Sequence, residues 1–167
     1  PTYLTAFTLI LLLAGLLYLG SGFGLLLVLV GRAAWARVWT SPVLPGGVEW
    51  RWLAGSIFFG GVVGPVALLY GLATTSASAA SLLLNLEAVF TALLAWFLFR
   101  ENFDRRIALG MLAIVAGGLT LAWAPGELAR SATGPLLIGA ACLCWAFDNN
   151  LTRKVSASDA VVIAALK

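Results

Sequence analysis

Long apolar runs alternate with short polar connections along the chain. Five of these runs have helical length, and they cover residues 3–30, 52–72, 79–99, 107–123 and 135–147, before a sixth run starts at Ala160. About 20 apolar residues, at a rise of about 1.5 Å per residue in a helix, match the hydrocarbon thickness of a bilayer. The pattern therefore predicts an all-α, multi-pass transmembrane helical bundle with about five spanning helices and the start of a sixth.

The third run carries two polar side chains within its apolar length, Asn85 and Glu87. A carboxylate at hydrocarbon depth costs several kcal/mol unless it faces protein or water. We expect Glu87 either to act in a cavity, as a cation site, a proton carrier or a partner of a buried lysine, or to be a structural group hydrogen-bonded to neighbouring helices. Small and amide side chains recur on another face, which we expect to pack closely against a neighbouring helix: Ser81, Asn85, Ala88, Ala92 and Ala95.

Other runs supply further candidates for a substrate path. Asp148, Asn149 and Asn150 follow the apolar part of the fifth run, and they either line that path or end a helix at the membrane interface. Tyr70 and Trp145 either form an aromatic wall or anchor helices at the interface. Gly64 and Pro65 predict a kink inside the second run, because proline removes a backbone hydrogen bond; it either faces the lumen or is purely structural.

Composition supports a lipid environment and limits the chemistry. Hydrophobic residues make up 62% of the chain and charged residues 10%, whereas about 25% charged is usual for a soluble domain. The sequence has no histidine, no cluster with metal-ligand spacing and no nucleophile elbow. We therefore expect no enzyme activity, no cofactor and no metal. The net charge of +3 is small, and it predicts no nucleic-acid partner.

The basic residues also indicate how the chain is oriented. Lysine and arginine number three, three and two in the connections after the first, third and fifth runs, but none and one after the second and fourth. The positive-inside rule places the first set in the cytoplasm, and so the first run starts outside. Since the sequence also begins at Pro1 and stops at Lys167 within an apolar run, we expect a fragment that lacks a preceding helix.

Three stretches of the sequence carry a family resemblance. The first is Gly60–Asn102, which contains NLEAVFTALLAWFLFREN. The second is Arg105–Trp123, RRIALGMLAIVAGGLTLAW, and the third is Gly134–Lys167, which opens with GPLLIGAACLCWAFDNNLTRK. Together they resemble the EamA family of the drug/metabolite transporter superfamily.

The resemblance implies a ten-helix transporter built from two inverted five-helix repeats around a central substrate path. Residues 1–123 would then be most of the first repeat without its first helix, and residues 134–167 the start of the second. It implies an exporter of small metabolites or drugs that works by alternating access in a bacterial inner membrane. The expected partners are lipid, a small-molecule substrate, the missing helices and a second copy in a homodimer. The alternative is a non-transporting membrane assembly module, or an inactive truncated fragment.

Overall fold

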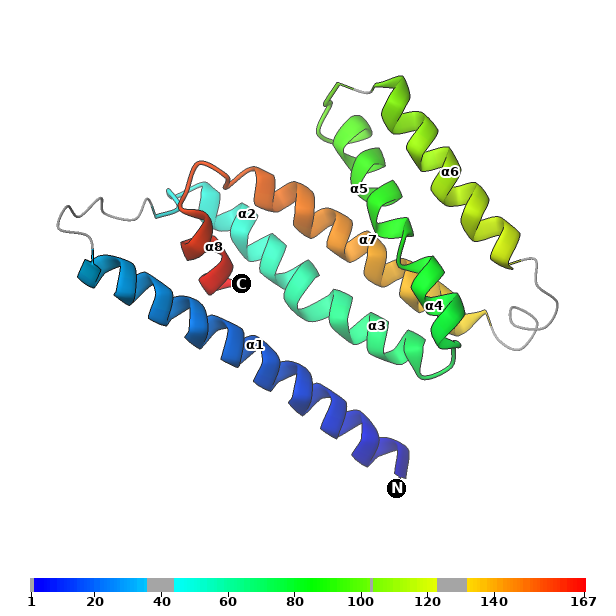
Figure 1. Ribbon diagram of the computed structural model, residues 1–167, viewed down its shortest axis with the longest axis horizontal. Coiled ribbons are helices and arrows are strands. Elements are labelled where there is room, and N and C mark those ends of the chain that lie inside the picture. Colours follow the sequence, from blue (N-terminus) through cyan, green and yellow to red (C-terminus); the bar gives the residue numbers. More distant parts are fainter. Residues whose placement is uncertain (1, 36–43, 103, 123–131) are drawn as a thin grey trace. The chain divides into compact units, whose positions relative to one another are not determined.

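The computed structural model describes residues 2–35, 44–102, 104–122 and 132–167 (Figure 1). Within these ranges the regular structure is helical and there is no strand, so the all-α prediction is confirmed for this part of the chain. The contacts divide the chain into two units, Pro1–Ala54 with Lys154–Lys167, and Gly55–Arg153. Each unit is described by itself.

The first unit contains the long helix α1 (Thr2–Trp35) and the short helix α8 (Ala160–Leu166), which contact one another. Asp159 caps α8 by accepting a hydrogen bond of 2.9 Å from the backbone N–H of Val161, and its carboxylate lies 3.9 Å from the guanidinium of Arg32. Helix α1 buries none of its apolar window Gly15–Arg32. An apolar helix of this length with its window unburied needs lipid around it.

The second predicted run is one continuous helical segment with an irregular centre. It begins as α2 (Glu49–Ser56), becomes the π-helix η1 (Ile57–Val63) and ends as α3 (Gly64–Leu72). Pro65 lies in the first turn of α3, directly after η1, and it cannot donate a backbone hydrogen bond to the preceding turn. The backbone irregularity thus falls on the seven residues before Gly64, and such π-helical stretches often mark functional positions.

The third predicted run is two helices rather than one, α4 (Ala77–Leu83) and α5 (Leu86–Phe97). Asn85 lies at the break, and its side-chain amide donates to the backbone carbonyls of Ser81 at 3.0 Å and Leu82 at 3.2 Å. The Asn85 amide thus occupies carbonyls at the end of α4, where it competes with the backbone N–H groups of the next helical turn for these acceptors. A short connection with Arg100 at φ 54° follows α5.

Helix α7 (Thr133–Arg153) is the central element of the second unit, because α3, η1, α4 and α5 all contact it. It extends beyond the predicted run and keeps Asp148, Asn149 and Asn150 within the helix. Figure 1 shows α7 beside α3 along much of its length. Helix α6 (Arg105–Ala122) contacts α4 and α5. The predicted end of the first repeat, residue 123, lies outside the described residues.

Close packing on α7 depends on glycine. A Cβ atom at Gly71 would lie 2.6 Å from Cγ1 of Ile138, and one at Gly64 would lie 2.9 Å from Nε1 of Trp145. Ile138 and Cys142 of α7 are fully buried, and they form a core cluster with Ala80 of α4. The glycines therefore allow the α3 backbone to approach α7 closely.

Three helical segments of the described chain are long and apolar enough to cross a membrane: Gly15–Arg32, Glu49–Leu72 and Ala77–Phe97. Helix α6 opens with two arginines and α7 ends in a polar run, which lowers the hydropathy of both. The predicted number of about five spans therefore stays a prediction.

Candidate functional site

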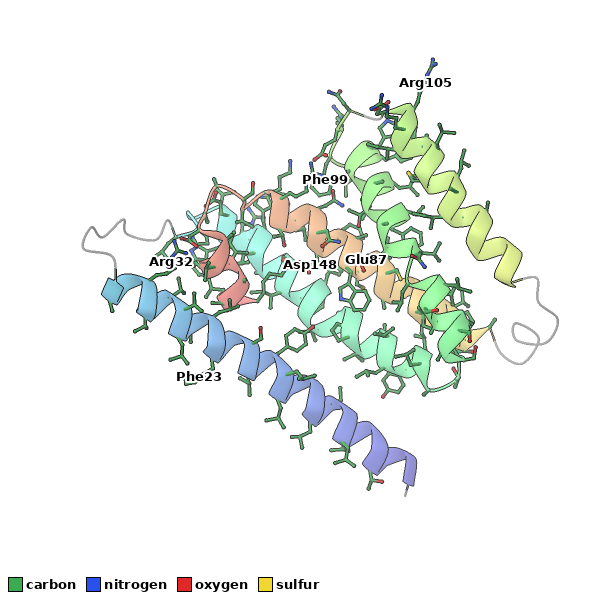
Figure 2. All side chains as sticks on the ribbon, in the orientation of Figure 1. Phe23, Arg32, Glu87, Phe99, Arg105 and Asp148 are labelled. Carbon is green, nitrogen blue, oxygen red and sulfur yellow. The ribbon has the colours of Figure 1, made fainter. Side chains whose placement is uncertain are left out.

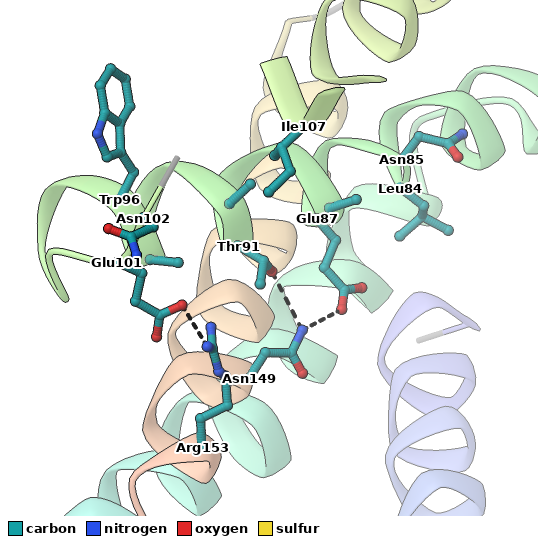
Figure 3. Close-up of a pocket in the computed structure, with 13 residues that line it drawn as sticks. Leu84, Asn85, Glu87, Thr91, Trp96, Glu101, Asn102, Ile107, Asn149 and Arg153 are labelled. Carbon is teal, nitrogen blue, oxygen red and sulfur yellow. Dashed lines mark hydrogen bonds and ion pairs between the residues drawn. The ribbon is translucent and has the colours of Figure 1, made fainter. Parts of the chain in front are cut away.

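A cavity of about 690 Å³ opens in the second unit, between α5, the connection after α5, the start of α6 and the C-terminal half of α7 (Figure 3). Ala88, Ala92 and Ala95 line it along α5. The sequence pattern predicts that this small-residue face packs closely against a neighbouring helix. In the structure these alanines face the cavity instead. Because these side chains end at Cβ, they leave the space that the cavity occupies.

One wall of the cavity is polar, and it joins two residues that are distant in the sequence. The side-chain amide of Asn149 donates to Oε1 of Glu87 at 2.9 Å and approaches Oγ1 of Thr91 at 3.4 Å. Thr91 follows Glu87 by one turn of α5, so both reach the same point on α7. The structure thus brings two of the predicted site residues, Glu87 and Asn149, into direct contact, and Asn85 also lines the cavity.

An ion pair lies at another part of the cavity wall. The guanidinium of Arg153, at the end of α7, is 2.5 Å from the carboxylate of Glu101 in the connection after α5. Both side chains are partly exposed, at 54% and 36%. Figure 3 shows this pair separate from the Glu87–Asn149 contact, with Trp96 and Asn102 near Glu101. The positive charge of Arg153 is therefore balanced within the cavity wall.

Asp148 is placed elsewhere in the unit and does not line the cavity. Its Oδ1 accepts hydrogen bonds from the hydroxyls of Ser56 and, at 3.1 Å, Thr152. The two hydroxyl oxygens lie 2.9 Å apart. Asp148 is 9% exposed and lies inside α7 (Figure 2), so it does not end a helix in water. It joins α7 to the segment that precedes η1.

The two aromatic candidates also lie away from the cavity. The indole N–H of Trp145 donates to the carbonyl of Gly60 in η1 at 3.2 Å. Tyr70 is 49% exposed near the end of α3. Gly64 and Pro65 do not line the cavity either, and Gly64 lies against Trp145 of α7. A role for these residues in a substrate path stays a prediction.

Sequence reasoning did not single out the two charged residues Glu101 and Arg153 as site residues, although both line the cavity. Asn150 is fully buried, and its amide donates to the backbone carbonyl of Thr91 at 3.1 Å, which ties α5 to α7. Helical spacing places Thr91 on the same face as Glu87, whereas the Glu101–Arg153 pair joins residues with no local relationship. In the described ranges, no three His, Cys, Asp or Glu side chains gather where they could hold a metal.

Residues 3–123 match the model of the EamA-like transporter family. An uncharacterized transporter of Methanothermobacter thermautotrophicus (strain Delta H) is 33% identical over 112 residues, which are 64% of this chain and 32% of that relative. The chain spans about a third of the length of this curated relative. No solved structure matches the chain significantly. The family match covers well over half of the sequence, and its multi-pass helical architecture agrees with the apolar helices described above; the chain belongs to the EamA-like transporter family.

Proposed function

We propose that this chain forms part of a membrane transporter that exports small metabolites or drugs, with the cavity beside Glu87 as a section of its substrate path. Family membership supports the general function. Since the chain spans about a third of its curated relative, transport belongs to the complete protein that contains it. That protein would carry two repeats, with residues 1–123 in the first and residues 134–167 opening the second, in the inner membrane of a bacterium.

The observation that carries the proposal is the Glu87–Asn149 contact in a cavity among apolar helices. Ionisable groups are expensive inside a bilayer, and those that persist usually mark a route for substrate or ions. The cavity volume of about 690 Å³ also falls in the range of small-molecule sites, about 300–1,000 Å³.

In alternating access, the cavity would open to one side of the membrane at a time. The Arg153–Glu101 pair is suited to a gate, because it connects the end of α7 to the connection after α5 at the cavity wall. An ion pair this exposed is worth little, about 0–1 kcal/mol, so thermal motion can break it. Helices α3 and α7, in glycine-dependent contact, would move together during the transition.

The test is transport by the complete protein in vesicles, screened with amino acids, nucleosides and cationic drugs. Glu87→Gln keeps the shape of the side chain and removes its charge. We expect transport to fall by roughly 10- to 100-fold, since a hydrogen bond to a charged group is worth about 1.5–3 kcal/mol. Asp104→Asn is the matched control, because Asp104 is exposed and lies outside the cavity wall.

Two outcomes would contradict the proposal. Undiminished transport by the Glu87→Gln protein would remove Glu87 from the path. A complete protein that inserts correctly and moves none of the compounds would favour the non-transporting assembly module instead. A vesicle flotation assay establishes insertion in both cases.

A further inference from the structure

We infer that the cavity contains a subsite for the ammonium group of an amphipathic organic cation, with Glu87 as its counter-charge and Thr91 and Asn149 beside it. This inference rests on the proposed function, and it names the substrate class that the site would take. It depends on three properties of the cavity wall: its charge, its unused hydrogen-bond acceptors and its apolar surface.

The charge of the wall is unbalanced. Three ionisable side chains line the cavity, Glu87, Glu101 and Arg153. Arg153 and Glu101 neutralise each other across 2.5 Å. Neither ion pair found among the described residues includes Glu87, whose side-chain contact is with a neutral amide. The wall therefore carries one uncompensated negative charge, and a cationic ligand would supply the missing charge.

The hydrogen-bonding groups around Glu87 also favour a ligand that donates. A carboxylate has about four lone-pair sites, and Glu87 receives a hydrogen bond from one side chain, Asn149. The Asn149 amide nitrogen is directed at Glu87 and Thr91, so its carbonyl oxygen is the part left for a ligand. Carboxylate, hydroxyl and amide oxygens thus gather in one place. An ammonium group, which has donors and no acceptor, fits this set, whereas a carboxylate or phosphate does not.

The remaining wall is suited to an apolar body attached to the cation. Alanine side chains of α5 and Ile107 of α6 line it, and Trp96 is 40% exposed at its edge. An indole ring attracts cations through the face of its π system. The combination of one anionic point with apolar and aromatic surroundings is typical of sites for amphipathic amines.

The test measures binding separately from transport. The complete protein in detergent is titrated with radiolabelled 2-phenylethylammonium and with 2-phenylethanol, a neutral compound of similar size. We expect the ammonium compound to bind at least about tenfold more tightly than the alcohol, and Glu87→Gln to abolish this preference. Asp104→Asn should leave both affinities unchanged.

Two further variants keep the test decisive if Glu87→Gln lowers the yield of folded protein. The double variant Glu87→Gln/Asn149→Asp exchanges acid and amide across the same contact, and it should restore the ammonium preference. Arg153→Gln leaves Glu101 unpaired and makes the wall more negative, so it should tighten ammonium binding. Equal binding of the two probes by the unmodified protein, a preference that survives Glu87→Gln, or weaker ammonium binding in Arg153→Gln would each overturn the inference.

Transport measured in parallel separates this inference from the proposed function. If the vesicles transport neutral or anionic compounds and the protein shows no ammonium preference, the inference is wrong and the proposed function stands. If the double variant Glu87→Gln/Asn149→Asp restores the ammonium preference but no solute crosses the vesicle membrane, the subsite is supported and the transport proposal fails.

Discussion

Asp148 shows how a buried charge is accommodated by its immediate neighbours. Two hydroxyls, from Ser56 and Thr152, donate to the same carboxylate oxygen. One donor lies one turn along α7 and the other comes from a segment 92 residues away. Burying a carboxylate is costly unless such partners are present, so this cluster stabilises the contact between α7 and the segment before η1.

Removing one of the two hydroxyl donors should reveal the free-energy cost of burying the Asp148 carboxylate. We expect Ser56→Ala to lower the free energy of unfolding by about 1–3 kcal/mol, because a buried charged acceptor loses a hydrogen bond. Equilibrium unfolding in detergent measures the change, with the exposed Ser156→Ala as control. The cost should shrink when Asp148 is already alanine; an equal cost in both backgrounds would show that the hydroxyl acts elsewhere.

At the scale of the elements, the helices that contact α7 are interrupted, and the causes differ. Asn85 ends α4 by taking two of its carbonyls, and the predicted single helix becomes α4 and α5. The segment from Glu49 to Leu72 stays helical but passes through η1, where Gly60 contacts Asp148 and its carbonyl accepts from Trp145. The apolar pattern predicted both runs as helical because their length and hydropathy match a bilayer. Hydropathy does not show where a side chain competes with the backbone for hydrogen bonds.

Gly60 provides a test of this close contact. A Cβ atom there would overlap the Asp148 carboxylate, lying 2.5 Å from its Cγ. We expect Gly60→Ala to destabilise the folded protein by about 1–3 kcal/mol, the usual cost of overpacking, as measured by thermal unfolding in detergent.

The matched control is Gly118→Ala in α6, where an added methyl group meets nothing within 4 Å. It should be neutral or stabilising by up to about 1 kcal/mol, since alanine is the better helix former. In an Asp148→Ala background the penalty at Gly60 should fall. Equal stability of the Gly60→Ala and Gly118→Ala proteins would contradict the assigned contact.

At the scale of the whole molecule, the chain depends on lipid. Helix α1 leaves its apolar window unburied, and the windows of Glu49–Leu72 and Ala77–Phe97 are only 22% and 17% buried. Water cannot solvate so much apolar surface at low cost, so membrane insertion precedes any function. The distribution of lysine and arginine then sets the orientation.

Orientation is testable by cysteine labelling of the complete protein in cells. With Cys142 and Cys144 replaced by serine, Ser78→Cys should react with a membrane-impermeant maleimide from outside. Arg106→Cys should react only after permeabilisation, because the basic connection after α5 is expected in the cytoplasm. Labelling of both sites from the same side would show that they do not lie on opposite faces. The reverse pattern would invert the predicted topology.

The sequence by itself determined the helical class, the lipid environment, the family and the presence of a carboxylate where charge is costly. These follow from run length, hydropathy and local motifs, which are properties of neighbouring residues. It also identified Asn85, Glu87 and Asn149, because polar groups stand out against apolar runs.

Only the tertiary structure decided which of these groups meet. Asn149 reaches Glu87 from 62 residues away, Ser56 reaches Asp148 from 92 residues away, and Glu101 pairs with Arg153. The same packing separates Asp148 and Trp145 from the cavity although they are close to Asn149 in the sequence. Successive residues of one helix point to different sides. Only the packing of α3, η1 and α5 around α7 decides which side of α7 faces the cavity and which side is buried.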